Sequence, residues 1–201
     1  MHPNSAFRRV PESRSLDFVR ARSFGALVVN APDGPLVSHV PFLLSEDAAS
    51  ADLHLVRSNP ILSATPCAAV IAVTGPDGYL SPDWYEVPDQ VPTWNYVAVH
   101  LRGRLVRLPQ EAMHEMLDRQ SAGFETRLAG KTPWTTDKMT PEVLERMMRQ
   151  IVPCRLEGIE LQATWKLSQN KPDDVRLRAA EAVTGGVGSE LAALAALMRG
   201  G

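Results

Sequence analysis

Four short polar clusters interrupt apolar, strand-like stretches of this sequence, and their side chains are of the kinds that hold small polar ligands. Three are the strings LVSHVPF (Ser38, His39, Val40), HLVRSNP (Arg57, Ser58, Asn59) and TWKLSQN (Lys166, Ser168, Gln169). The fourth, VPTWNY, places Thr93, Trp94 and Asn95 on a stretch that otherwise resembles a strand. Asparagine is depleted in strands, so Asn95 indicates either a hydrogen-bonded rim residue or a strand face that meets a polar ligand.

The Arg57–Asn59 cluster allows two interpretations. A guanidinium beside a hydroxyl and the amides of a turn can hold a phosphate, because arginine binds phosphate through two hydrogen bonds and adjacent N–H groups attract anions. The same pattern also suits a strand-end turn with a solvated arginine. Taken together, the four clusters supply donors and aromatic rings at strand ends, which favours a planar aromatic ligand that carries a phosphate. Trp94 and Trp165 either line such a ligand or pack at a barrel rim.

Other common chemistries lack their motifs here. The sequence contains no glycine-rich phosphate loop and no G-x-S-x-G nucleophile elbow. His39, His54 and His100 fall on expected strands, but no nearby carboxylate completes a ligand set, so hydrogen-bonded histidines are predicted and no metal site. Asp173 and Asp174 are expected to begin a helix, where negative charge suits the helix dipole.

Composition places the chain among ordinary globular proteins. It has 201 residues, a formal net charge of -2 and two cysteines, and charged residues make up 22%. The charge argues against a strongly basic nucleic-acid surface. Two isolated cysteines indicate reduced thiols, and no signal-like or membrane-spanning apolar run is present, so a cytoplasmic protein is expected. Residues 1–184 are expected to form one domain and residues 185–201 a helical tail that begins with the glycines of TGGVG.

Hydrophobic periodicity predicts a mainly β protein with added helices. A leading helix with Ser13 or Ser15 as N-cap is followed by a hairpin whose turn is rich in proline and glycine. Further strands are expected at 51–57, 67–75, 94–108 and 157–167, and helices at 109–124, 140–151, 171–183 and 189–200. The proline-rich segment between residues 75 and 93 is expected to be an ordered loop. Strands joined by hairpins without βαβ alternation predict an antiparallel barrel or sandwich.

Several strings together resemble the PaiB family, whose members are described as FMN-binding negative transcriptional regulators. They are SHVPFLL, HLVRSNP, GPDGYLSPDWY, VPTWNYVAVHLRGRL and GIELQATWKLSQNK, and the resemblance runs from about Phe18 to Val183. The family belongs to the FMN-binding split-barrel superfamily. The resemblance implies a six-stranded antiparallel Greek-key split barrel, a homodimer, and FMN bound in the groove between the subunits.

The resemblance also assigns expected contacts. Ser38, His39 and Val40 would lie along the isoalloxazine ring, and Arg57, Ser58 and Asn59 would take the phosphate. The segments containing Thr93, Trp94 and Asn95, and Lys166, Ser168 and Gln169, would line the ring and ribityl chain. Trp84 and Tyr85, on the proline-rich loop, could cover the groove.

Three functions follow as hypotheses. The first is a PaiB-like negative transcriptional regulator or flavin and redox sensor, with DNA as a candidate partner although the arginines are scattered and no helix-turn-helix pair is evident. The second is an FMN-dependent oxidoreductase, a flavin reductase or a relative of pyridoxamine phosphate oxidases. WKLSQN is similar to a carboxy-terminal element of those oxidases, but Gln169 stands where they have arginine. The third is a haem-handling barrel with a strand histidine as axial ligand.

Overall fold

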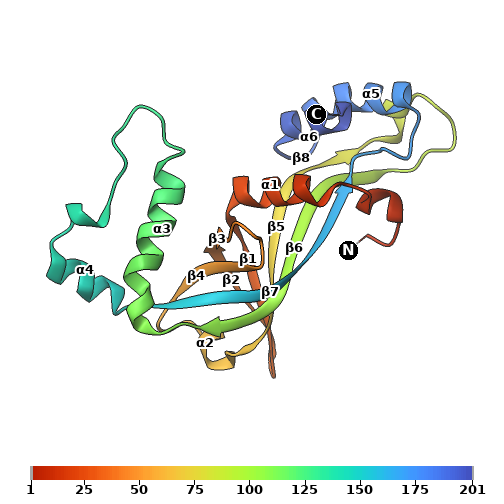
Figure 1. Cartoon of the computed structure of the whole chain (residues 1–201). Helices are drawn as coiled ribbons and strands as arrows, with labels where there is room; N and C mark the ends of the chain where they lie inside the picture. The colour runs from red at the N-terminus through yellow and green to blue at the C-terminus, as the bar shows by residue number, and fades with distance from the viewer. Residues whose placement is uncertain (1, 201) are drawn as a thin grey trace. The chain divides into compact units, whose positions relative to one another are not determined.

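The computed structural model describes residues 2–200, which form two compact units. The large unit comprises Leu16–Val73 and His100–Leu161. The small unit comprises residues 2–15, 74–99 and 162–200. Three long strands, labelled in Figure 1, contribute residues to both units: β5 (Cys67–Leu80), β6 (Thr93–Arg107) and β7 (Ile151–Lys166).

The fold is an antiparallel sheet with added helices, as the sequence predicts. The hydrogen-bonded strand order is β2-β1-β5-β6-β7-β4-β3, and β8 pairs with β5. Six strands are long, as expected. The described residues add two strands of two residues each, β3 (Leu43–Leu44) and β8 (Gly188–Ser189). Since β4 pairs with β7 and not with β5, which follows it in the chain, the order includes the non-sequential neighbours that a Greek key requires.

The large unit begins with a hairpin. β1 (Phe24–Ala31) pairs with β2 (Gly34–Pro41) so that Ala31 faces Gly34 across a two-residue turn. Gly34 has φ +119°, a conformation that glycine adopts without strain. Its remaining elements are β4 (Ser50–Val56), α2 (Ile61–Ala64), η3 (Gln110–Ala112), α3 (Met113–Glu125), η4 (Thr136–Lys138) and α4 (Pro141–Met148).

A buried carboxylate fixes α3 to the strands of the large unit. Asp52 on β4 accepts hydrogen bonds from Arg119 of α3 at 2.7 Å and from Arg155 of β7 at 2.6 Å. Gln120 donates to the backbone oxygen of Asp52 at 3.0 Å, and its own side-chain oxygen lies 3.1 Å from His54 Nδ1. Burial alone would raise the pKa of Asp52, but the two arginines outweigh it and leave that pKa below its ordinary value.

The small unit packs helices on the continuing strands. Its elements are η1 (Ser5–Arg8), η2 (Pro82–Tyr85), α5 (Asp173–Ala182), η5 (Val183–Gly185) and α6 (Leu191–Arg199). A Cβ at Gly78 of β5 would lie 2.8 Å from Leu194 of α6, so glycine permits the close approach of that helix. The C-terminal helix therefore packs on strands of its own chain, beside α5 (Figure 1).

Some of the local predictions differ from the structure. The first helix, α1, spans Glu12–Arg22, so neither Ser13 nor Ser15 is its N-cap. Ser15 is buried instead, and its hydroxyl accepts a hydrogen bond from Trp165 Nε1 at 3.0 Å. β7 begins at Ile151, well before the expected residue 157. Thr140 is the N-cap of α4 with Pro141 following, as predicted.

Candidate functional site

A pocket of about 210 Å³ lies within the small unit. Four residues expected from the sequence line it together: Thr93 and Asn95 at the start of β6, Lys166 at the end of β7, and Ser168 two residues beyond it. Residues alternate between the faces of a strand, so Thr93 and Asn95 share one face. Phe7, Tyr85 and Val91 form the apolar part of the wall.

A buried hydrogen-bond network forms one side of this pocket. Ser168 Oγ lies 2.9 Å from the Tyr85 hydroxyl and accepts a hydrogen bond from Asn95 Nδ2, also at 2.9 Å. Tyr85, Asn95 and Ser168 are all buried, and burial raises the pKa of Tyr85. Asn95 Nδ2 makes a second, longer contact with Met198 Sδ at 3.5 Å. Tyr85 is thus part of the network and not the exposed cover expected from the sequence.

The carboxamide oxygen of Asn95 has no hydrogen bond in this network. Asn95 is 0% exposed, and its Oδ1 is the buried side-chain polar atom left without a partner across residues 2–200. An unsatisfied buried acceptor costs about 1–3 kcal/mol. Because Asn95 lines the pocket, a ligand that brings an N–H or O–H group to this oxygen would remove that cost.

Two lysines and one carboxylate, that of Asp89, line the pocket, so its charge is positive on balance. Lys166 donates to Thr93 Oγ1 and lies 6.0 Å from the centre of the Phe7 ring. Burial lowers the pKa of Lys166. Lys171 donates to the Gln90 side chain and lies 5.3 Å from the centre of the Tyr85 ring. Amides, hydroxyls, aromatic rings and ammonium groups around one cavity suit a planar ligand with oxygen-rich polar ends.

Two expected contacts of the small unit lie elsewhere. Trp94 faces away from Thr93 and Asn95, is 41% exposed, and donates from Nε1 to Asp77 Oδ1 at 3.1 Å. Gln169 uses its amide locally: its Oε1 accepts from the backbone N–H of Leu167 at 2.8 Å, and its Nε2 donates to Trp165 and to Ala6 backbone oxygens. Neither side chain lines the pocket.

In the large unit, the expected ring contacts of β2 divide between two faces. Ser38 and Val40 point to one side and His39 to the other. Val40 is 3% exposed, and Ser38 accepts a hydrogen bond from Asn59 Nδ2 at 2.7 Å. His39 is exposed and stacks on Phe24 with ring centres 6.3 Å apart. A ligand can therefore meet the side chain of His39 or that of Ser38, but not both from one face.

The Arg57–Asn59 turn is held by its own hydrogen bonds. Arg57 donates from Nε to the backbone oxygen of Arg149 at 2.7 Å and from Nη2 to Gln110 at 2.8 Å. Asn59 Oδ1 accepts from the backbone N–H of Ile61 at 3.0 Å and so begins α2. Ser58 is exposed. Arg57, although exposed, thus clamps the residue that caps the C-terminal end of α4.

Phe7, Gln90 and Lys171 are pocket residues that the sequence reasoning missed. Phe7 lies in a polar leader, where a lone aromatic residue was the available signal. Gln90 and Lys171 lie in irregular segments, where no periodicity indicates the direction of a side chain. Among residues 2–200, no group of three or more His, Cys, Asp or Glu side chains is arranged to hold a metal ion.

Comparison with known proteins shows the family of the chain. Residues 1–159 match the model of a family described as "Putative FMN-binding domain". The chain belongs to this FMN-binding family. It is 32% identical to the protease synthase and sporulation protein PAI 2 of Bacillus subtilis over 159 residues, which cover 77% of this chain and 75% of that protein. The resemblance to the PaiB family is therefore confirmed.

Solved structures agree on the fold. The flavocytochrome Anf3 of Azotobacter vinelandii superimposes with a TM-score of 0.59 at 13% identity, over 82% of this chain and 72% of that one. An FAD- and heme-binding protein of Mycobacterium smegmatis gives 0.53 at 16% identity, over 88% and 78%. The predicted class, a split barrel of the flavin-binding type with added helices, is confirmed.

FMN is the cofactor of this FMN-binding family, and the pocket of the small unit fits part of it. The flavin carries a ring N–H and ribityl hydroxyls that Asn95 Oδ1 can accept from, and carbonyl and phosphate oxygens that Lys166 can donate to. When bound, FMN supplies one- and two-electron redox chemistry, while the protein binds and orients it. No helix in the described part of the chain is long and apolar enough to cross a membrane.

Proposed function

We propose that this chain is a homodimeric, PaiB-like regulator that senses flavin or redox state through FMN held at the pocket of the small unit. The observation that carries the proposal is the buried, unpaired Oδ1 of Asn95, a residue of the same pocket that Lys166 lines. The name of the Bacillus relative refers to protease synthesis and sporulation, both programmes of gene expression, which supports a regulatory role.

The size of the pocket supports a dimer. Its volume of about 210 Å³ is below the range of about 300–1,000 Å³ usual for small-molecule sites, so part of the flavin must lie outside it. The second subunit is proposed to cover that part. An apolar face for pairing exists in the large unit, where Phe24 and Val37 are 53% and 55% exposed on the same face of β1 and β2.

The proposed flavin contacts follow from exposure and hydrogen bonding. Thr93, Asn95, Lys166 and Ser168 are proposed as direct contacts of the small unit. The roles expected for the remaining residues stay predictions: Ser38, His39, Val40, Arg57, Ser58, Asn59, Trp94 and Gln169.

The dimer is tested by light scattering and by FMN titration of the same samples. Val37→Glu places a charge on the apolar face and is expected to give monomers with weakened FMN affinity. Leu177→Glu introduces the same charge at a 41%-exposed leucine of α5 and is the matched control. A monomeric wild-type protein that binds FMN fully would contradict the dimeric site.

The regulatory role is tested on DNA. Because the net charge is -2, DNA contact is proposed to be confined to a local patch or to be made through another protein. Regulation is proposed to depend on the redox state of the flavin. Gel-shift titration with the upstream region of its own gene, with oxidised and with reduced FMN, is expected to differ between the two states. Equal behaviour in both states, together with unchanged transcript levels in a deletion strain, would refute regulation.

A second candidate is an FMN-dependent oxidoreductase. The observation in its favour is Lys166, a cation beside the pocket that can stabilise negative charge on a reduced flavin. It predicts bleaching of the flavin absorbance by NADH or NADPH without air. A flavin that stays oxidised under excess of both would remove this candidate.

A reducing, cytoplasmic setting is proposed for either function. Cys67 and Cys154 are both free thiols, and burial raises the pKa of Cys154 to about 11. A thiol with so high a pKa is little ionised at neutral pH and reacts slowly.

A further inference from the structure

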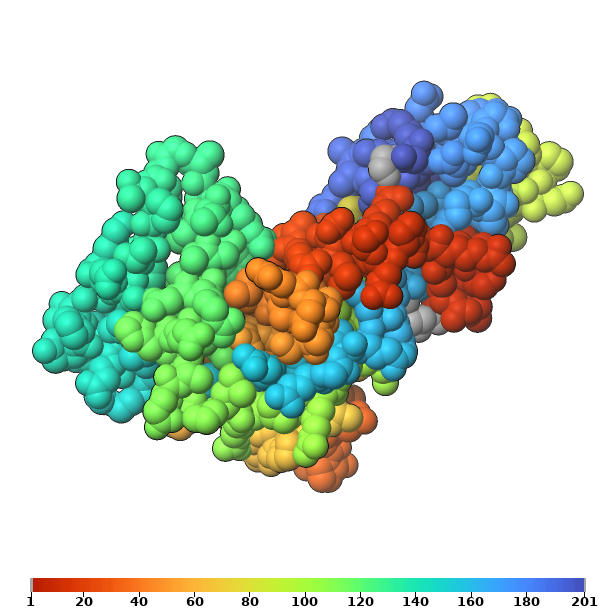
Figure 2. Space-filling model, in the orientation of Figure 1, coloured from red at the N-terminus to blue at the C-terminus, as the bar shows by residue number. Residues whose placement is uncertain are grey.

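Helix α4 leaves its apolar side incompletely covered. None of its residues is buried, although Val143, Leu144, Met147 and Met148 recur at helical spacing. Met147 is 52% exposed. An amphipathic helix normally buries such a stripe against a neighbour. Figure 2 shows this segment, in teal, at the surface.

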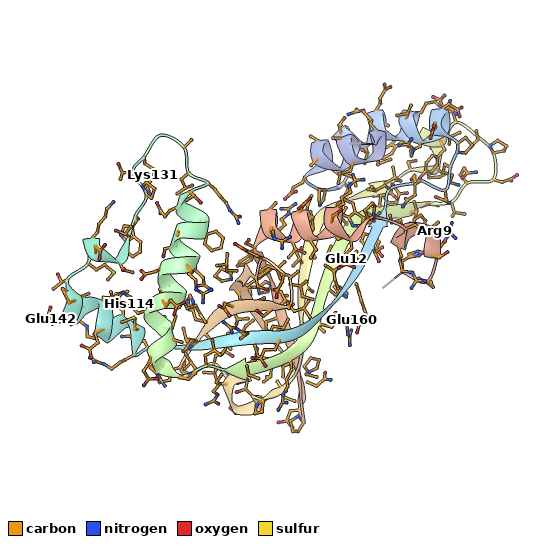
Figure 3. The ribbon with its side chains drawn as sticks, in the orientation of Figure 1. Arg9, Glu12, His114, Lys131, Glu142 and Glu160 are labelled. Carbon is orange, nitrogen blue, oxygen red and sulfur yellow. The ribbon has the colours of Figure 1, made fainter. Side chains whose placement is uncertain are left out.

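The apolar side of α4 faces a cavity and not a packed core. The cavity, called the α3–α4 pocket below, has a volume of about 300 Å³ and lies within the large unit. Leu117 and Ser121 of α3 form one wall, and Leu144, Met147 and Met148 of α4 form the opposite one. In Figure 3, His114 marks α3 and Glu142 marks the start of α4.

The segment between the two helices closes a third side. Trp134, Thr136 and Met139 line the pocket from this segment. Its position is fixed by hydrogen bonds to α3: Thr136 Oγ1 donates to Asp118 Oδ1 at 2.6 Å, and the Trp134 backbone N–H donates to Glu125 at 2.8 Å. This wall is therefore preformed.

The far end of the pocket is fixed by the Arg57 clamp. Val56 and Ile151, the neighbouring ends of β4 and β7, line the floor. Arg57 binds the backbone oxygen of Arg149, and Gln110 Nε2 donates to that of Met148 at 3.0 Å. These bonds hold the C-terminal end of α4 at its distance from α3, so the cavity does not depend on a ligand to open it.

The lining specifies the chemistry of an occupant. None of its residues in the described chain is charged, and the polar ones are Ser121, Thr136 and Gln150, of which Thr136 already donates to Asp118. Methionine side chains adapt to different shapes, and an indole offers an aromatic face. We propose that the α3–α4 pocket is a binding site for a neutral, apolar or aromatic small molecule, separate from the flavin site.

The volume suits a small molecule. About 300 Å³ is at the lower limit of the range of about 300–1,000 Å³ that is usual for small-molecule pockets. The contrast with the flavin pocket is chemical, because that pocket carries Lys166 and Lys171. FMN, with its phosphate, is thus a poor occupant of the α3–α4 pocket.

The test uses N-phenyl-1-naphthylamine, a neutral apolar probe whose fluorescence rises in apolar surroundings. FMN-loaded wild-type protein is expected to bind one probe per subunit with saturation. Met147→Glu places a charge at an exposed rim position, so the fold should persist while probe affinity falls at least tenfold. Ser121→Phe fills the cavity and is expected to weaken the probe similarly. Leu177→Glu on α5 is the matched control and should leave binding unchanged.

Three results would overturn the proposal. The first is that the wild-type protein shows no saturable binding of the probe. The second is that wild type, Met147→Glu and Ser121→Phe bind the probe equally in samples with unchanged circular dichroism. The third is that Met147→Glu dissociates the protein into smaller species in light scattering. The last would make the pocket part of an interface between copies. FMN affinity is measured in the same samples and is expected to be unchanged, so failure here is distinguishable from failure of the flavin proposal.

Discussion

Replacing Asn95 by leucine tests whether this side chain serves ligand binding or the stability of the fold. In the protein without flavin, Asn95 gains one good hydrogen bond, to Ser168 at 2.9 Å, while its buried Oδ1 has none. The bond contributes about 1 kcal/mol, and the unpaired oxygen costs about 1–3 kcal/mol. Leucine has a similar shape and removes both. We therefore expect Asn95→Leu to leave the free energy of unfolding of the apo-protein unchanged or raise it by about 1 kcal/mol.

The same substitution is expected to weaken FMN binding. A hydrogen bond from the flavin to Oδ1 worth about 1.4 kcal/mol corresponds to a tenfold change in dissociation constant. Urea denaturation of the apo-protein gives the first quantity, and quenching of flavin fluorescence on titration gives the second. The two effects should have opposite signs, which a simple packing role does not produce.

Ser168→Ala is the matched control in the same network. It removes the hydroxyl that meets both Tyr85 and Asn95, and so leaves the Tyr85 hydroxyl unpaired and Asn95 Nδ2 with only its longer contact to Met198 Sδ. We expect it to lower the stability of the apo-protein by about 2 kcal/mol. If Asn95→Leu also costs about 2 kcal/mol and leaves FMN affinity unchanged, the carboxamide is structural and the reasoning is refuted.

Three further predictions concern charge and packing. Asp52→Asn should lower stability by about 2 kcal/mol at pH 7 in urea denaturation. Because the pKa of Asp52 is lowered in the fold, this contribution to stability is present above the ordinary value of 3.8 and is lost as the pH falls below it. The free energies of unfolding of wild type and variant should therefore converge in acid. A constant difference between them at all pH values would contradict the ion cluster. Lys166→Met should weaken FMN binding about tenfold. As the pH rises, the FMN affinity of the wild type should begin to fall before the ordinary lysine pKa of 10.5 is reached, because burial lowers the pKa of Lys166. An affinity that does not change with alkaline pH would count against the role of Lys166. Gly103→Ala should cost about 1–3 kcal/mol in urea denaturation, since its Cβ would lie 2.5 Å from the Glu157 backbone oxygen, and an unchanged midpoint would disprove the close approach.

Most of the fold could be predicted because local patterns and packing agree in it. The β1–β2 hairpin follows from two β-rich runs around proline and glycine, and α4 follows from Thr140 and Pro141. The start of β7 was missed because Pro153 has no N–H, and proline is seldom found inside a central strand. Its backbone oxygen nonetheless accepts from Leu108 at 2.9 Å, a partner that the local sequence does not specify.

The site was harder to predict because its residues meet only in the folded chain. Asn95 was detectable, since asparagine is unusual in a strand and its oxygen is indeed unpaired. Tyr85 was expected to cover a groove, but burial and Ser168 fix it inside the small unit. For Arg57, either a phosphate contact or a solvated turn was expected. Its hydrogen bond to the end of α4 could not be predicted from the local sequence, because the partner, Arg149, lies 92 positions away.

A crystal structure of the protein, from crystals grown in the presence of FMN, tests the central claim most directly. Flavin density is expected against Asn95 and Lys166 in the small-unit pocket, with a second copy of the chain over the part that the pocket leaves outside. Flavin bound elsewhere, with Asn95 Oδ1 still unpaired, would contradict it.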